Sequence, residues 1–460
     1  MEEQIDLSVT DFHPIQTTEY IDRRIMGGEQ EYGILVRGDK REKFTEKGWE
    51  VKGDSSFLDN GARFYEDQGH PEYASPETDT PLTATLYDRA GELIAGRRLT
   101  YENTKISIKR ENKRLYKHNR DSDGNAYSAH ENYCLDENSL RQEKFLADLE
   151  FLANRIIPFL ATRQIFIGSG FINENGNYEL SQRASKIDQK ISNSTTCERG
   201  MINSRNEPLA NPGSFSRLHL IVADSNMSDP TIFLKYGTMA LVLDLFEDGY
   251  LDPFKLKKPV RSIRNISLDM DMKNKYGIVG ESSMTAIEIN RIYLDKAEQH
   301  YASRDNQTAE ILRRWGDSLD HIKEDSKNLD SQLDWRIKRK LLKTYMKKYG
   351  GSLKDNQLRL VELQFHDVDR RRGLFQLLEQ AGRVERFFSE DQIMYASKNP
   401  PKSTRARARG EIRKLTRKIR NKGHTISFGW DYIMINNRRF KMDDPYDTYE
   451  DLEEKILRLI

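Results

Sequence analysis

Two strand-like segments near the start of the chain carry charged or polar side chains at alternate positions. They are GGEQEYG at residues 27–33 and NGARFYED at residues 60–67. Because side chains alternate between the two faces of a strand, Glu29 and Glu31 should share a face. Any fold for this chain must therefore find cations, water or solvent for rows of carboxylates on a sheet.

The second segment places three polar groups on one strand face, namely Arg63, Tyr65 and Asp67. An arginine fork binds phosphate oxygens, and carboxylates such as Asp67 and Glu72 suit a hard cation such as Mg²⁺. These clusters indicate a metal and nucleotide site on a sheet. The alternatives are a solvated face for GGEQEYG and an edge strand with a proline turn for NGARFYEDQGHP.

Two histidines extend this picture. GNAYSAHENY (124–133) leads through a turn to His130, and RLHLIVADSN (217–226) reads as a strand with Arg217 and His219 on one face. The turn before His130 could deliver polar groups into a site. A lone histidine in an apolar strand is more often a satisfied core residue, and Arg205 and Arg217 could equally be surface charges.

Composition excludes several classes of protein. The chain has 460 residues, 74 basic against 73 acidic residues, and a net charge of +1, which gives no sign of nucleic-acid or membrane binding. Cys134 and Cys197 stand in no metal-ligand spacing and predict two free buried thiols. The polar start and the lack of long apolar runs predict a soluble, cytoplasmic protein, which we expect to be a monomer.

The chain divides into unequal parts. We expect a polar N-terminal arm over residues 1–20, a large α+β domain over 21–398 and a small C-terminal domain over 399–460. The boundary is set by KNPPKSTRARARG, in which paired prolines oppose helix. The basic segment 402–422 lacks interleaved aromatic residues, so we expect it to face solvent or an acidic partner rather than nucleic acid.

Apolar periodicity predicts several helices. They cover residues 138–160, 283–300 with Ser283 as the cap, and one or two long helices over 308–348. A strand-like piece, FGWDYIMIN, follows at 428–436 before a final helix. P-loop, GxGxxG, kinase, HExxH and GxSxG motifs are absent from the sequence.

Long motifs along the chain carry a resemblance. RRIMGGEQEYG, NGARFYEDQGHPEYASPE, GNAYSAHENY, INSRNEP, RLHLIVADSNM and PPKSTRARARGE occur in this order. Together they resemble the Pup ligase and depupylase family of the carboxylate-amine ligase superfamily, from about Arg23 to the C-terminus. The resemblance implies a glutamine-synthetase-like α+β fold, with a curved antiparallel sheet as a cradle backed by helices and a small C-terminal domain.

The resemblance also implies roles for single residues. Asp67 matches the catalytic aspartate of the family. The implied Mg²⁺ ligands are Glu29, Tyr65 and Glu72, with Glu31, His130 and His219 in the wider metal site. The implied ATP contacts are Arg63, Ser75 and Trp430, to which we add Arg205 and Arg217. A core aromatic of the small domain is the alternative for Trp430.

The implied reaction is an ATP-dependent ligation. The side-chain carboxylate of the last glutamate of a small, disordered, acidic Pup-like modifier would become a γ-glutamyl phosphate, which a lysine of a target protein attacks. The short stretch Ile34–Ser56 favours the ligase branch. The two-residue spacing between Asp67 and His70 favours the alternative, a depupylase or deamidase. A small-molecule carboxylate-amine ligase is a further alternative.

Overall fold

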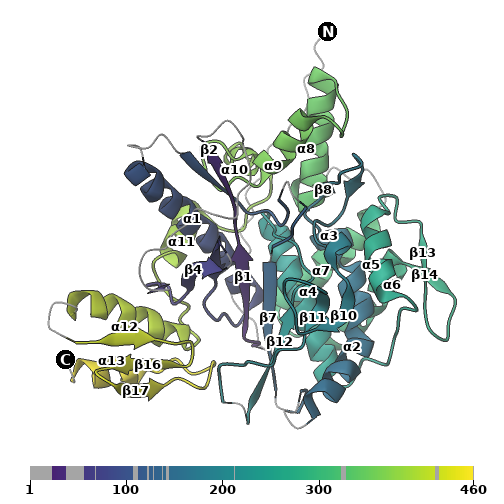
Figure 1. Ribbon diagram of the computed structural model, residues 1–460. Helices are drawn as coiled ribbons and strands as arrows, with labels where there is room; N and C mark the ends of the chain where they lie inside the picture. The colour runs from purple at the N-terminus through teal and green to yellow at the C-terminus, as the bar shows by residue number, and fades with distance from the viewer. Residues whose placement is uncertain are drawn as a thin grey trace.

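A computed structural model describes most of the chain and is shown in Figure 1. The described residues are 23–37, 56–67, 69–106, 112–121, 124–127, 129–136, 138–140, 144–211, 213–322, 328–419 and 424–458. The predicted N-terminal arm, 1–20, lies outside them.

A large, mainly antiparallel sheet forms the centre of the molecule. Its strand order is β10-β11-β12-β7-β1-β5-β4-β3, and among these only β10 and β11 run parallel. The strands are β1 Met26–Glu31, β3 Ser56–Phe57, β4 Arg63–Asp67, β5 His70–Ala74, β7 Ala129–Asp136, β10 Gln189–Ser192, β11 Gly200–Asn203 and β12 Phe215–Leu220. With the helices around it, this sheet confirms the α+β prediction.

Helices cover one face of this sheet. They include α1 (Pro81–Ile106), α2 (Phe145–Thr162) and α4 (Asp229–Glu247). Tyr73 and Tyr133 point to this face and are almost completely buried, Tyr73 against α1 and Tyr133 beside Tyr236 of α4. Burial of these apolar surfaces is the main force that holds helices and sheet together.

The predicted helices form close to their expected places. Besides α2, they are α6 (Ala286–Tyr301), α7 (Asn306–His321) and α8 (Asp334–Tyr349). The cap of α6 differs from the prediction. Thr285, rather than Ser283, accepts the backbone N–H of Glu288, whose side chain accepts the N–H of Thr285 in return.

Smaller elements complete the large part of the molecule. The paired strands are β2 Gly33–Arg37 with β6 Asn112–Tyr116, β8 Phe171–Ile172 with β9 Tyr178–Glu179, and β13 Lys275–Gly277 with β14 Ser283–Thr285. The remaining α-helices are α3 Gln164–Ile167, α5 Pro259–Leu268, α9 Asn356–Phe365, α10 Leu374–Gln380 and α11 Glu390–Ala396.

The C-terminal segment forms a small unit with its own core. Its elements are α12 Ala406–Ile419, β15 Ile426–Phe428, β16 Tyr432–Ile435, β17 Arg438–Lys441 and α13 Glu450–Leu457. Ile412, Ile433 and Ile456 pack together inside it. In Figure 1 this unit, in yellow, lies beside the large part, and we retain a domain boundary near residue 398 as a proposal.

The structure bears on two further expectations. No helix within the described ranges is both long and apolar enough to cross a membrane. Both cysteines are free, as predicted, but Cys197 is exposed and Cys134 is only half-buried, so the prediction of two buried thiols is wrong.

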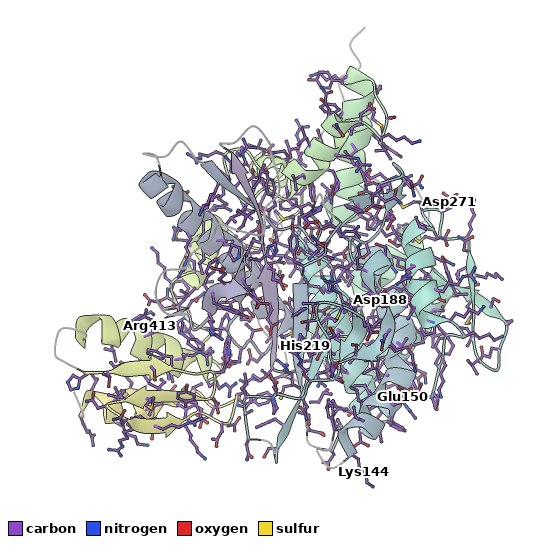
Figure 2. The ribbon with its side chains drawn as sticks, viewed as in Figure 1. Lys144, Glu150, Asp188, His219, Asp271 and Arg413 are labelled. Carbon is purple, nitrogen blue, oxygen red and sulfur yellow. The ribbon has the colours of Figure 1, made fainter. Side chains whose placement is uncertain are left out.

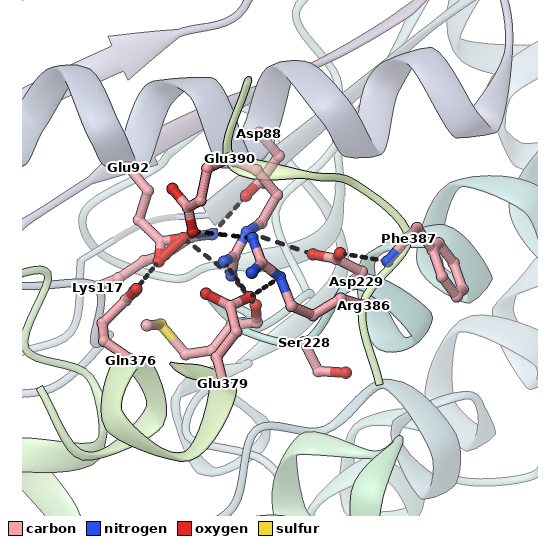
Figure 3. A network of polar contacts seen from close by, with 12 residues as sticks. Asp88, Glu92, Lys117, Ser228, Asp229, Gln376, Glu379, Arg386, Phe387 and Glu390 are labelled. Atoms are coloured by element: carbon pink, nitrogen blue, oxygen red, sulfur yellow. Dashed lines mark hydrogen bonds and ion pairs between the residues drawn. The ribbon is translucent and has the colours of Figure 1, made fainter. Parts of the chain in front are cut away.

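A buried network of charges lies where α1, α4 and α10 meet (Figure 3). Arg89 of α1 is 2% exposed and its guanidinium lies 2.6 Å from Glu379, 3.3 Å from Asp229 and 3.3 Å from Glu92. Asp229 also accepts the backbone N–H of Phe387 at 2.8 Å. Arg89 therefore joins α1, the start of α4 and α10, and Asp229 links the segment after α10 to this network.

Replacing this arginine should destabilise the protein strongly. Arg89→Leu leaves several buried carboxylates without their cation, so we expect the free energy of unfolding to fall by about 3–5 kcal/mol. Arg313→Leu is the matched control, because Arg313 of α7 is 54% exposed and pairs with Glu310 at 2.7 Å. Its change should stay within about 1 kcal/mol. Urea unfolding measures both, and a change of similar size in the two variants would contradict the prediction.

Candidate active site

Strand register brings the predicted site residues to the face of the sheet away from α1, α2 and α4. Glu29 of β1 lies opposite His130 of β7, and Glu31 lies opposite Glu72 of β5. Glu72 in turn lies opposite Tyr65 of β4. Directly opposed residues point to the same face, so this register joins the charged segments into one surface.

The same rule places the remaining strand residues. Asp67 pairs with His70 and Arg63 with Ala74 on neighbouring strands. On the other side, His219 lies opposite Asn132 and Arg217 opposite Cys134. This register confirms the predicted alternation of side chains along both charged segments. Figure 2 shows His219 near the centre of the molecule.

Glu29 is the centre of the first cluster on this face. His130 Nδ1 donates to Glu29 Oε2 at 2.9 Å, Asn132 Nδ2 donates to Oε1 at 3.1 Å, and His219 Nε2 lies 3.9 Å from Oε2. Burial opposes ionisation, but the His130 hydrogen bond and the neighbouring His219 and Arg217 hold the pKa of Glu29 well below its ordinary value. Glu29 is therefore a carboxylate across the physiological range.

Three acids form the second cluster, in which single carboxylate oxygens of Glu31, Asp67 and Glu72 lie within 4.8 Å of one another. Burial, Glu29 and Glu31 raise the pKa of Glu72 well above its ordinary value. Burial and Glu31 raise the pKa of Asp67. Tyr65 donates its hydroxyl proton to Glu72 Oε1. Clustered acids of this kind attract a cation that offsets their repulsion.

The donor atoms of both clusters fit divalent cations. His130 Nε2 and both ring nitrogens of His219 are buried and have no hydrogen-bond partner. One donor atom each of Glu29, His130 and His219 lie within 4.8 Å of one another. Buried polar atoms without partners are rare unless an ion or water completes them. The acid cluster offers only oxygen atoms, which Mg²⁺ prefers.

A pocket of about 790 Å³, including its open space, lies at the end of this face toward the C-terminal unit. Its wall includes Glu29, Tyr65, Ser75, Arg217 and Trp430, five residues predicted from the sequence. The Ser75 hydroxyl accepts the backbone N–H of Gly28 at 2.9 Å, which holds the Ser75 side chain against β1. The pocket joins residues that lie more than 400 positions apart in the chain, such as Glu29 and Trp430.

Arg63 and Arg205 lie outside the wall of this pocket. Arg63 is half-buried on β4, with its guanidinium 4.5 Å from the centre of the Tyr65 ring. Arg205 is exposed on the loop after β11, although its charge contributes to lowering the pKa of His219, after burial, His130 and Arg217. Arg63 therefore adjoins the acid cluster, whereas Arg205 is more peripheral.

The structure adds wall residues that sequence reasoning missed. Glu77 lines the pocket and binds two arginines from the basic segment, Arg405 and Arg409. We call these three residues the Glu77 clasp. Arg405 and Arg409 are 3% and 0% exposed, so the expectation that the whole basic segment faces solvent or an acidic partner is wrong for them. The only signal was the motif TRARARG, which does not reveal burial.

Comparison with known proteins identifies the family. The family model described as Pup-ligase protein matches residues 39–434. The chain belongs to the Pup-ligase protein family. A curated Pup--protein ligase of Mycobacteroides abscessus is 34% identical over 95% of this chain and 99% of its own length. Pup--protein ligase of Mycobacterium tuberculosis is 35% identical with the same coverage.

Solved structures of the Pup-ligase family share the fold. One is the complex of the prokaryotic ubiquitin-like protein Pup and its ligase PafA, with a TM-score of 0.85, 29% identity and coverage of 95% of this chain and 92% of the other. Another is the Pup ligase PafA in complex with ADP, with a TM-score of 0.80, 31% identity and coverage of 89% and 91%. The predicted fold class is thereby confirmed.

Removing one acid of the second cluster should weaken divalent-cation binding. Glu72→Gln lacks a carboxylate that the cluster offers, so we expect the affinity for Mn²⁺ to fall at least about tenfold. Glu66→Gln is the control, because Glu66 is exposed on the other face of the same strand. Isothermal titration of both variants measures the effect, and equal affinities would argue against a cation site here.

The Glu77 clasp should make stability depend on pH. Burial opposes the charge of Glu77, but Arg409 and Arg405 lower its pKa from 4.5 to about 2. The carboxylate should therefore contribute about 3 kcal/mol above pH 4.5 and lose this contribution as the pH falls toward 2. We expect Glu77→Gln to be less stable than the wild type at pH 7.

Urea unfolding from pH 7 downward measures this difference, which should shrink below pH 4.5. Glu450→Gln is the control, because Glu450 is 70% exposed and pairs with Arg407 at 2.8 Å. That variant should differ little from the wild type at any pH. A Glu77→Gln deficit that stays constant as the pH falls would refute the prediction.

Proposed function

We propose that this chain is an ATP-dependent ligase that joins the side-chain carboxylate of the C-terminal glutamate of a small Pup-like modifier to lysines of target proteins. The observation that carries the proposal is its match to proteins named Pup--protein ligase over 95% of the chain and 99% of their length. Its acidic sheet face retains the groups that such a reaction needs.

The nucleotide would occupy the pocket beneath Trp430. Its wall combines a tryptophan ring with Ser75 and Arg217, and it opens beside Glu29 and Tyr65 of the acidic face. A solved relative, PafA, is described in complex with ADP. In this arrangement Arg217 and Arg63 would contact phosphate oxygens and spread their charge as the phosphoryl group moves.

Mg²⁺ would be held by the two clusters of the acidic face, with Glu29, Tyr65 and Glu72 as ligands and Glu31, His130 and His219 around them. A bound divalent cation supplies charge neutralisation for the phosphates. Burial, reinforced by His130, lowers the pKa of His219 well below its ordinary value, so this ring is neutral and retains a lone pair for a ligand bond.

Asp67 would act as the general base. A carboxylate is a poor electrophile, so the modifier's glutamate would first be activated as an acyl phosphate. An attacking lysine has an ordinary pKa of about 10.4 and must lose a proton. Burial and Glu31 raise the pKa of Asp67, which strengthens it as a proton acceptor. Asp67 lies beside Glu31 and Glu72, so the base would stand next to the proposed Mg²⁺ site.

This chemistry fits the cytoplasm, where ATP is made and cysteines stay reduced. Both cysteines of the chain are free. The proposed partners are an acidic, disordered modifier, which would order on binding, and lysine-bearing target proteins. A monomeric enzyme stays a prediction.

A conjugation assay tests the function. Enzyme, Mg-ATP, a Pup-like modifier ending in glutamate and a lysine-bearing protein are mixed, and intact mass reveals conjugate while ADP is assayed. Asp67→Asn should lower the conjugation rate at least about a hundredfold, because it removes the base. Its affinity for ADP should stay within about threefold of the wild type, and Glu66→Gln should conjugate normally.

One outcome would overturn the proposed function, and another would overturn only the role of Asp67. If the wild type cleaves preformed conjugate but never forms any, the depupylase alternative replaces the ligase. Conjugation by Asp67→Asn at the wild-type rate would remove Asp67 from the mechanism while leaving the ligase function intact.

A further inference from the structure

The motif TRARARG begins the C-terminal unit with three arginines at alternate positions. Arg405 and Arg409 are buried, whereas the side chain of Arg407 is 33% exposed and pairs with Glu450. A buried arginine requires partners for its five N–H donors. The burial of Arg409 therefore depends on the groups that it binds.

The bonds of Arg409 connect three separate parts of the chain. Its guanidinium binds both carboxylate oxygens of Glu77, which lies after β5. Its Nε donates to the carbonyl oxygen of Gly61 at 2.9 Å, just before β4. Its Nη1 donates to the carbonyl oxygen of Trp430 at 2.9 Å. One side chain thus joins the large sheet to the loop that carries Trp430.

Aromatic contacts fix the same tryptophan from two sides. The Arg409 guanidinium lies 4.7 Å from the centre of the Trp430 ring and 5.2 Å from that of Phe57. The Phe57 and Trp430 rings meet edge to face at 5.0 Å. Cation–π and edge-to-face contacts of this kind favour a single ring orientation.

The backbones around Arg409 approach closely enough to exclude side chains. A Cβ at Gly61, which has a φ of +79°, would lie 2.8 Å from the carbonyl oxygen of Ala406. A Cβ at Gly410 would lie 2.5 Å from the carbonyl oxygen of Asp59. The start of α12 is therefore seated directly on the loop before β4, and the position of Arg409 is well defined.

Both Glu77 and Trp430 line the pocket, and Arg409 lies behind them. We propose that Arg409 is a positioning residue for the nucleotide, which sets Trp430 over the pocket and couples nucleotide binding to the seating of the C-terminal unit. The inference rests on the proposed function, because it takes the pocket to be the ATP site. The guanidinium itself acts through Trp430 and Glu77.

Arg409→Lys is the direct test, because it retains the charge but loses the fork and the planar stacking surface. We expect ADP affinity to fall about tenfold and the KM for ATP to rise similarly, with kcat within about twofold. Arg407→Lys on the same helix is the matched control and should match the wild type. Isothermal titration with ADP and the conjugation assay measure these values.

A double-mutant cycle of Arg409→Lys with Trp430→Phe separates a positioning role of Arg409 from a general loss of structure. If Arg409 acts through the indole ring, Arg409→Lys should weaken ADP binding much less in the Trp430→Phe background than in the wild type. A full tenfold loss in both backgrounds would overturn the proposal. So would ADP affinity and KM in Arg409→Lys that equal those of the wild type.

A second variant applies if Arg409→Lys does not fold. Phe57→Leu keeps all clasp bonds but removes the ring edge against Trp430, so ADP affinity should fall about threefold, and unchanged affinity would count against the proposal. The wild type decides the proposed function separately. If the wild type does not bind ADP at all, the assignment of the ATP site fails. If the wild type binds ADP and Arg409→Lys binds it equally well, only the positioning role is refuted.

Discussion

The antiparallel register of β1 between β5 and β7 is the constraint on which the rest of the structure depends. It sets Glu29 opposite His130 and Glu31 opposite Glu72, so that four strands present one acidic face. A slip of one residue would turn every side chain to the opposite face. Gly28 helps to fix this arrangement, because a Cβ there would lie 2.3 Å from the Tyr236 hydroxyl of α4.

The two faces of the sheet differ in how their carboxylates are paired. Behind β7, Glu131 is buried and its carboxylate is bound by both terminal nitrogens of Arg163 and by the Tyr133 hydroxyl. In front, burial and neighbouring acids raise the pKa values of Glu72 and Asp67. The fully bonded Glu131 behind the sheet makes this region rigid, and the clustered acids in front attract a cation.

Local patterns predicted much of the fold and the site. Alternation along GGEQEYG and NGARFYED correctly separated the two strand faces, and apolar periodicity located α2, α6, α7 and α8. Errors arose where neighbours in space decide the outcome. The basic segment contains equally spaced arginines, and only contact with Glu77 distinguishes buried Arg405 and Arg409 from half-buried Arg407.

The amino-acid sequence by itself determined the alternation of charge along each strand and, through its long motifs, the family. These properties depend on residue type and spacing, which are local. Tertiary structure alone decided that Glu29 meets His130 and His219, and that Glu77 and Trp430 share one arginine. Such contacts join residues up to several hundred positions apart, and the geometry of packing, which no local pattern encodes, brings them together.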